Sequence, residues 1–103
     1  QLLWDGSTLG VLDVDTAARG EVALDLGNLL AHADLRLTQN IFTPSTSDTI
    51  AGHVNTVAAA LNVNPARLET YRRAALLRLA CVYAFRPTSK DWLPGWVDTC
   101  VTL

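Results

Sequence analysis

The chain has 103 residues, half of them apolar, with eight lysines and arginines against ten aspartates and glutamates and a formal net charge of −2. This length suits one modest domain, and the charge gives no electrostatic case for binding nucleic acid or an anionic membrane surface. Every apolar stretch is interrupted by a charged or polar residue well before the length that would predict a transmembrane span.

Two features of the sequence suggest that the chain is a piece of a longer protein. A domain this small normally has proportionally more surface to cover with polar groups, so we expect part of its apolar content to pack against something else. The chain also begins at Gln1 and contains no methionine. From both features we expect a piece of a longer protein.

The first fifteen residues predict a β-hairpin. Apolar residues 2–4 and 9–14 flank Asp5 and Gly6, and glycine accepts the positive φ that a tight hairpin turn requires. An isolated hairpin is marginally stable in water. This one is therefore expected to lean on other strands or helices.

Two aspartates at the end of the second strand are candidate metal ligands. Alternate residues of a strand share a face, so Asp13 and Asp15 would point the same way. Their repulsion would be relieved by a hard cation, and Mg²⁺ prefers oxygen ligands. The alternative is that the strand ends at Asp13 and both acids face solvent in a turn.

After Gly20 the apolar residues recur at helical spacing, which predicts helices for the rest of the chain. The first helix is expected over residues 21–37. Its predicted apolar face consists of Val22, Leu26, Leu29, Leu30, Ala33 and Leu37. Gly27 lies inside this helix, where glycine costs about 1 kcal/mol relative to alanine. We therefore expect a close backbone approach at Gly27.

A polar stretch with a proline separates the first helix from the second. Residues 40–47, which include Pro44, predict a loop. Ser45 or Ser47 is expected to cap the second helix, with Asp48 in its first turn. The second helix is predicted to end near residue 62.

The third helix has a clear start signal, with Asn64 as cap and Pro65 at the first helical position. It is expected to run to residue 85 or 86. A short last helix is predicted after Pro94. Trp92 and Trp96 are expected to cap the helical core, and the alternative is that they line a substrate cleft. The predicted fold class is mainly α with a short N-terminal β-hairpin.

The run from residue 12 to residue 32, LDVDTAARGEVALDLGNLLAH, resembles a segment of the aminoglycoside phosphotransferase and choline kinase superfamily. These enzymes carry, after the catalytic loop, an apolar strand, Asp-x-Asp, small residues, glycine, an acidic residue, and Asp-Leu opening an apolar helix. The matching positions are Asp13, Asp15, Ala17, Gly20, Glu21, Asp25 and Leu26. The resemblance covers about residues 1–35. It implies part of the large C-terminal lobe of a protein-kinase-like fold, with the metal-binding hairpin in 1–15 and a helical subdomain in 21–103.

The resemblance also implies roles for four residues. Asp13 matches the aspartate that holds the Mg²⁺ bridging the nucleotide phosphates, and Asp15 is the second carboxylate of that motif. Gln1 falls where the family has an asparagine metal ligand, and its longer side chain would shift the geometry. Asp25 matches the aspartate that braces the catalytic loop, although simple placement against the helix dipole is the alternative.

The implied activity is transfer of the γ-phosphoryl group of ATP or GTP to a hydroxyl of a small molecule, with Mg²⁺ stabilising charge. The expected base, an aspartate five residues before the position of Gln1, lies outside this chain, as does the nucleotide-binding lobe. The chain alone is therefore expected to be inactive, and to self-associate or need its missing N-terminal half. A cytoplasmic location, without nucleic-acid or membrane partners, is expected.

Two other classes of protein remain as alternatives. A noncatalytic helical interaction module would explain the apolar content, but would leave the ordered run from Asp13 to Asp25 a coincidence. A haloacid dehalogenase-like phosphohydrolase also begins with an apolar strand and Asp-x-Asp, but it expects threonine where Ala17 stands.

The remaining reactive residue types lack supporting patterns. His32 and His53 have no partner at ligand spacing and are expected to be structural. Cys81 and Cys100 are expected to be buried or free thiols. Four arginines lie in or near the third helix, Arg72, Arg73, Arg78 and Arg86, and helical geometry spreads them around its circumference. A solvated face is expected for them.

Overall fold

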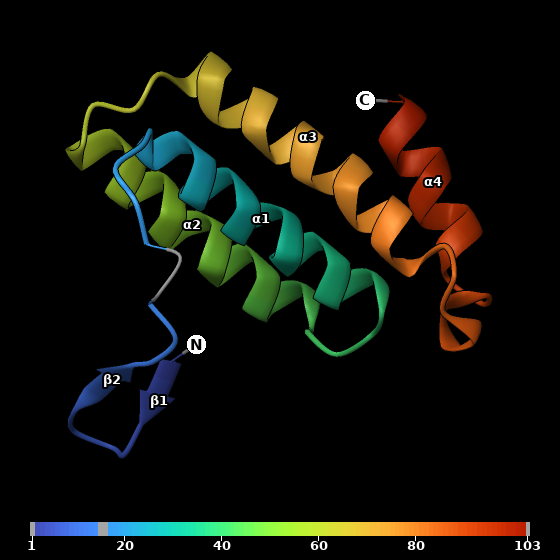
Figure 1. The fold of residues 1–103 in the computed structure, drawn as a ribbon, viewed down its shortest axis with the longest axis horizontal. Helices are drawn as coiled ribbons and strands as arrows, with labels where there is room; N and C mark the ends of the chain where they lie inside the picture. Colours follow the sequence, from blue (N-terminus) through green and yellow to red (C-terminus); the bar gives the residue numbers. More distant parts are fainter. Residues whose placement is uncertain (1, 15–16, 103) are drawn as a thin grey trace.

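A computed structural model describes residues 2–14 and 17–102 of the chain (Figure 1). Within these residues the protein is mainly helical, with one antiparallel hairpin at its N-terminal end, which confirms the predicted fold class. The elements are β1 (Leu2–Trp4), β2 (Leu9–Val11), α1 (Val22–Thr38), α2 (Pro44–Ala60), α3 (Pro65–Tyr83), the 3-10 turn η1 (Pro87–Ser89) and α4 (Leu93–Thr102).

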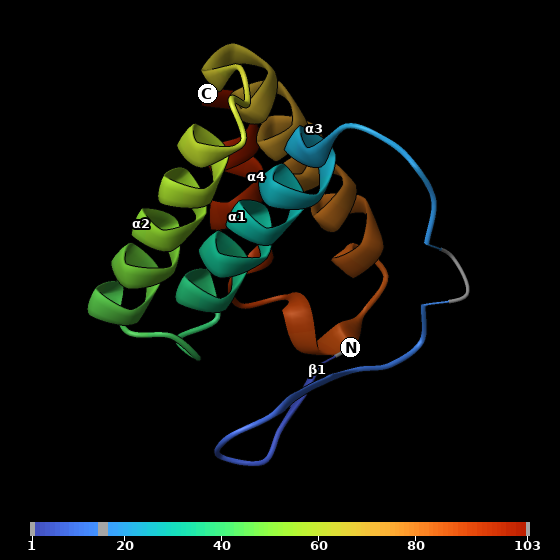
Figure 2. The same ribbon diagram turned by 90° about the vertical axis from the view of Figure 1, so that its left-hand side faces the viewer.

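The hairpin forms where the sequence predicts it. Leu2 pairs with Val11 and Trp4 with Leu9. The carboxylate of Asp5 accepts backbone N–H bonds from the residues two and three positions later, at 2.9 and 2.7 Å, and the glycine between has φ of 101°. Figures 1 and 2 show the hairpin standing away from the helices. The large apolar side chains of both strands are consequently exposed.

The second strand is shorter than predicted. It ends at Val11 rather than continuing through Val14, and Asp13 has φ of 61°. A left-handed residue cannot continue a strand, whose φ lies near −120°. The prediction that Asp13 lies on the strand is therefore wrong. Asp15, predicted to share its face, lies outside the described residues.

Helix α1 occupies the middle of the helical body, with α2 on one side and α3 on the other, and α4 packs on α3 (Figure 2). Its buried residues are Ala23, Gly27, Ala31, Ala33 and Leu35. Of the apolar face predicted for this helix, Ala33 is buried and Leu26, Leu30 and Leu37 are half-buried, but Val22 and Leu29 are exposed, so the prediction is wrong at those two positions. A helix between two neighbours buries small residues where a second backbone comes close.

At Gly27 the backbone of α1 lies close to α3. A Cβ atom built on Gly27 would lie 2.8 Å from the backbone nitrogen of Arg72 and 2.8 Å from the Cβ of Tyr71. Real Cβ atoms hardly ever come so near other heavy atoms. The predicted close backbone approach at Gly27 is confirmed.

The second helix begins earlier than predicted. Pro44 is its first residue, and the hydroxyl of Thr43 caps it by accepting the backbone N–H of Thr46 at 3.1 Å. Proline suits the first helical position because its missing N–H would have no partner there. The predicted caps at Ser45 and Ser47 are therefore wrong, and the residue predicted for the first turn, Asp48, lies beyond it.

The third helix begins as predicted. The side-chain oxygen of Asn64 accepts the backbone N–H groups of Ala66 and Arg67, at 2.8 and 3.4 Å. Farther along α3, the carbonyl of Leu76 accepts the indole N–H of Trp96 at 3.2 Å. Trp96 belongs to α4 and is 1% exposed. Trp92 lies edge-on to both Trp96 and a tyrosine of α3. The prediction that these tryptophans cap the core is confirmed.

The main core lies between α1, α3 and α4, and its buried members are Ala31, Leu35, Ala75, Leu76, Leu79 and Trp96. Among the described residues, no helix is both long and apolar enough to cross a membrane.

Candidate functional site

Asp13 is an exposed residue with an unusual backbone conformation, two positions after the hairpin ends. Two other described residues with a side chain, Asn40 and Asn62, also have positive φ, at 60° and 55°. Both follow a helix, where a left-handed asparagine commonly closes the last turn. Asp13 ends no helix. Left-handed residues away from such positions cluster at functional sites, so Asp13 is a candidate on geometric grounds.

The predicted metal ligands are described in part. Gln1 and Asp15 lie outside the described residues. Within residues 2–14 and 17–102, no three histidines, cysteines, aspartates or glutamates come together in a group that could hold a metal ion. The carboxylate of Asp13 is the kind of donor that Mg²⁺ accepts, and Mg²⁺ is commonly held by one or two carboxylates together with substrate phosphates and water. Asp13 fits that use as one ligand of a shared shell.

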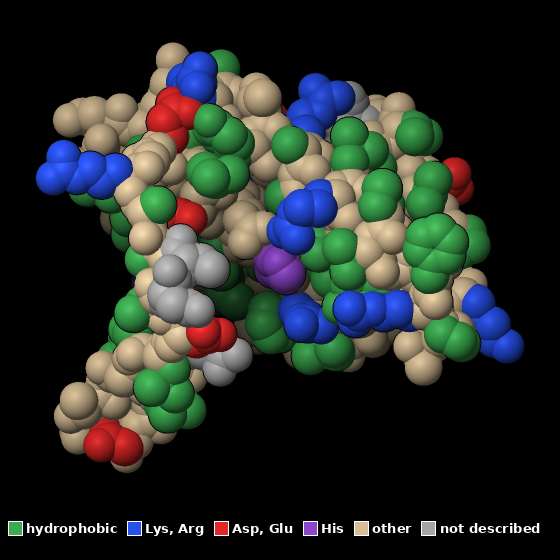
Figure 3. Space-filling view, in the orientation of Figure 1, with side chains coloured by type: hydrophobic (Ala, Val, Ile, Leu, Met, Phe, Trp, Pro, Cys, Tyr) green, Lys and Arg blue, Asp and Glu red, His purple; other side chains and the backbone are tan. Residues whose placement is uncertain are grey.

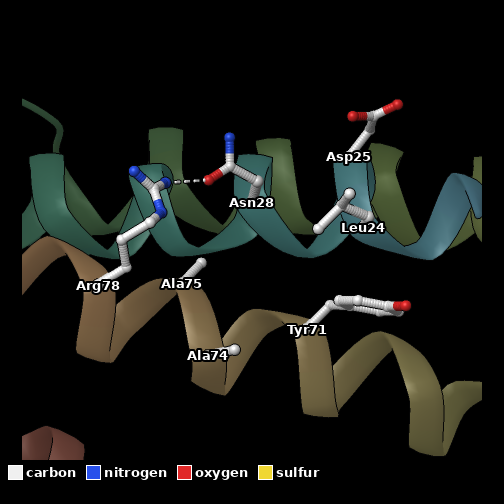
Figure 4. A pocket seen from close by; sticks show the side chains of 7 residues that line it. All are labelled: Leu24, Asp25, Asn28, Tyr71, Ala74, Ala75 and Arg78. Carbon is white, nitrogen blue, oxygen red and sulfur yellow. Dashed lines mark hydrogen bonds between the residues drawn. The ribbon is translucent and has the colours of Figure 1, made fainter. Parts of the chain in front are cut away.

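Asp25 lies in the first turn of α1, as predicted, and its side chain is exposed. It borders a surface groove of about 390 Å³ between α1 and α3 (Figure 4). The groove is lined by Leu24, Asp25, Asn28, Tyr71, Ala74, Ala75 and Arg78. In Figure 4 the carboxylate of Asp25 points away from α3, and no described residue forms a hydrogen bond with it. It is thus free to accept bonds from a segment laid across the start of α1.

Glu21 anchors the start of α1 to α3, which the sequence did not indicate. Arg67 donates from Nε and Nη2 to the two carboxylate oxygens of Glu21, each at 2.5 Å, and the hydroxyl of Tyr71 donates to the same carboxylate. The hydrogen bonds from Arg67 and then Tyr71 lower the pKa of Glu21 to about 2. The partners are 46 and 50 residues apart, so only the fold brings them together.

The hydrogen bonds of Glu21 fix the point at which the chain that follows Asp13 joins the helices. Glu21 is the residue at which the chain enters α1, four positions before Asp25. The chain that follows Asp13 therefore enters α1 at a residue, Glu21, that is hydrogen-bonded to α3. Helix α1, which carries Asp25, also packs closely on α3 at Gly27.

No protein-family model, curated protein or solved structure matches the chain. The case for a site at Asp13 and Asp25 therefore rests on the order of the residues and on the geometry described above.

Proposed function

We propose that this chain is part of the large lobe of a kinase-like phosphotransferase. The whole protein would move the γ-phosphoryl group of ATP or GTP to a hydroxyl of a small molecule, with Mg²⁺ held in part by Asp13. The chain by itself would be inactive, because the catalytic-loop aspartate and the nucleotide-binding lobe are supplied from elsewhere in that protein.

The observation that carries this proposal is the position and conformation of Asp13. It lies two positions after an antiparallel hairpin, is exposed, and adopts a left-handed conformation away from any helix end. Such a conformation turns the chain sharply at the carboxylate and presents it outside the sheet. A carboxylate displayed in this way can share a Mg²⁺ ion with nucleotide phosphates that bind from the solvent side.

The surroundings of Asp25 support the same proposal. Its carboxylate stands at the first turn of α1 beside an open groove, where backbone N–H groups of another segment could reach it. A catalytic loop that crosses here would be braced by Asp25 within the same lobe that carries Asp13.

The first experiment replaces Asp13 with alanine in the longer protein and measures ATP consumption with a panel of aminoglycosides, choline, sugars and homoserine. We expect kcat to fall by at least about a hundredfold, because the bound Mg²⁺ supplies much of the charge stabilisation in phosphoryl transfer. Asp48→Ala is the matched control, since Asp48 is an exposed aspartate on α2. An Asp13→Ala enzyme with activity within a few-fold of the control would contradict the metal assignment.

The coding sequence before Gln1 gives an independent test. A His-x-Asp motif with its aspartate five residues before Gln1, preceded by a small nucleotide-binding lobe, would support the phosphotransferase. Unrelated sequence at that place would argue against it.

A helical interaction module remains the second candidate, and the exposed apolar side chains of the hairpin favour it. Leu2, Leu3 and Trp4 are 67%, 59% and 66% exposed. Such a module would form a stable oligomer of fixed size in sedimentation experiments, unaffected by Mg²⁺ and nucleotide. A lobe separated from its enzyme would instead be stabilised by adding the missing half.

A further inference from the structure

The turn between α3 and α4 borders a hollow in the surface that the phosphotransferase proposal does not use. Its volume is about 510 Å³, which is within the range of small-molecule sites. Two cations, Arg86 and Lys90, line it together with Phe85, and the other lining residues are an alanine, a leucine and two prolines. The hollow thus combines an apolar surface with two positive charges.

Backbone hydrogen bonds hold both cations at the edge of this hollow. The N–H of Arg86 donates to the carbonyl of Tyr83 at 3.1 Å, and the N–H of Ser89 donates to the carbonyl of Arg86 at 3.0 Å. The N–H of Trp92 donates to the carbonyl of Ser89 at 3.2 Å. Arg86 directly precedes the 3-10 turn η1 and Lys90 directly follows it. One short, hydrogen-bonded segment therefore carries both charges.

The guanidinium of Arg86 is held in place by an aromatic ring. Its Cζ lies over the ring of Tyr83, 4.6 Å from the centroid, and Tyr83 packs edge-on against Trp92 with centroids 5.3 Å apart. Such a ring attracts the cation without neutralising its charge. The N–H groups of Arg86 therefore remain available to an anion.

Neither cation is paired with an acid in the part of the chain that the structure describes. The ion pairs there belong to Arg67 and Arg72, and no carboxylate forms a hydrogen bond with Arg86 or Lys90. Asp91 follows Lys90 in the chain but does not line the hollow. The hollow is consequently positive and complementary to an anion.

Phe85 adds an apolar contact surface beside these charges. It is 93% exposed, more than any other large apolar side chain among the described residues. In Figure 3, basic side chains stand next to apolar ones at the lower right, where Figure 1 shows the turn between α3 and α4. A ligand that has both an apolar ring and a negative charge would match this surface.

We propose that Phe85, Arg86 and Lys90 form a binding site for a small aromatic carboxylic acid. The planar fork of a guanidinium matches the two oxygens of a carboxylate, which assigns the acid group to Arg86. The ammonium of Lys90 contributes a second positive charge. The ring of the ligand lies against Phe85 and the neighbouring prolines, where it removes apolar surface from water.

The sequence did not indicate this site, because it grouped Arg86 with the arginines of the third helix. In the structure α3 ends at Tyr83, so Arg86 belongs to the turn that follows and lines the hollow with Lys90. The site does not depend on the proposed phosphotransferase activity. Binding can be measured on the chain as it is.

The test is a titration of the 103-residue chain with phenylacetate at constant ionic strength, followed by NMR of the backbone amides. We expect the signals of Phe85, Arg86 and Lys90 to shift and saturate, while that of Gly52, exposed on α2, stays in place. Benzyl alcohol supplies the ring without the charge, and acetate supplies the charge without the ring. Each should bind about tenfold more weakly than phenylacetate or less.

Two variants and one control connect the binding to the proposed residues. Arg86→Gln should weaken phenylacetate binding by about tenfold, as expected for loss of a charge-assisted hydrogen bond. Lys90→Gln should weaken it by about threefold, as expected for an exposed charge. Both side chains are exposed, so neither change removes core packing. Arg19→Gln removes the same charge at an exposed position outside the helices and should leave the affinity unchanged.

Saturating shifts that weaken in Arg86→Gln and Lys90→Gln, and not in Arg19→Gln, support the site. Benzyl alcohol binding as tightly as phenylacetate would mean that the carboxylate is not recognised, and acetate binding as tightly would mean that the ring is not. Shifts that do not saturate, or an equal loss of affinity in Arg19→Gln, would reduce the effect to general screening. Any of these results would overturn the proposal.

Discussion

Replacing Gly27 with alanine tests the close contact between α1 and α3. In a helix interior free of neighbours, alanine is more favourable than glycine by about 1 kcal/mol. At Gly27 the new methyl group would lie 2.8 Å from the backbone nitrogen of Arg72 and from the Cβ of Tyr71. Neither atom can swing away as the end of a long side chain could, so α1 and α3 must separate. Overpacking of this kind costs about 1–3 kcal/mol.

The net expectation is that Gly27→Ala lowers the free energy of unfolding by up to about 2 kcal/mol, because the overpacking cost exceeds the gain from alanine. Gly52 provides the matched control, because it is also inside a helix, α2, and no described atom comes within 4 Å of a Cβ built there. Gly52→Ala should raise the free energy of unfolding by about 0.5–1 kcal/mol. Urea unfolding followed by circular dichroism measures both variants. If Gly27→Ala is stabilised as much as Gly52→Ala, the close approach of α1 and α3 is refuted.

Three further predictions concern single side chains. Asn64→Ala should lower the free energy of unfolding by about 1 kcal/mol in urea, because it removes the cap of α3, and an unchanged midpoint would contradict the cap. Ser89 is 1% exposed and its hydroxyl has no partner among the described residues, so Ser89→Ala should leave the thermal midpoint unchanged or raise it; a lower midpoint would reveal a hidden partner. The folded-state pKa of Glu21, about 2, lies below its ordinary 4.5, so its anchor stabilises fully above pH 4.5 and is lost as the pH falls toward 2. Over that range the unfolding temperature of Glu21→Gln should therefore fall less steeply than that of the natural chain, and parallel curves would disprove the anchor.

Elements with local signals could be predicted from the sequence. The Asp5-Gly6 turn and the Asn64-Pro65 start each depend on neighbouring residues, and both form as expected. The start of α2 was misplaced because serine, threonine and proline stand side by side there, and several of them can serve as caps. Thr43 takes that role since it directly precedes Pro44, which fits the first helical position.

Packing choices could not be predicted in the same way. Val22 and Leu29 are large and apolar, and a rule based on hydrophobicity assigns them to the core, yet both are exposed. The middle position of α1 favours alanine and glycine toward α3 instead, as the contacts of Gly27 show. Which face a helix buries depends on how closely its neighbours approach, and a single sequence does not contain that distance.

The candidate site could likewise be predicted only in part. The order of Asp13 and Asp25 could be read from the sequence, but the left-handed turn at Asp13 could not, because an aspartate commonly adopts several conformations. The anchor of Glu21 joins residues 46 and 50 positions apart, and the hydrogen bond from Arg78 to Asn28 also spans 50 positions. Contacts of that separation follow from the packing of α1 on α3.

The hairpin gives the molecule an optical reporter of its own assembly. The chain has three tryptophans, of which Trp96 is buried in the core, Trp92 packs against that core, and Trp4 is 66% exposed on the hairpin. Indole emission moves to shorter wavelength when water is removed from the ring. Any partner that covers the hairpin will therefore shift the emission of Trp4, while Trp96 keeps its emission, and a Trp4→Phe variant will lose the response.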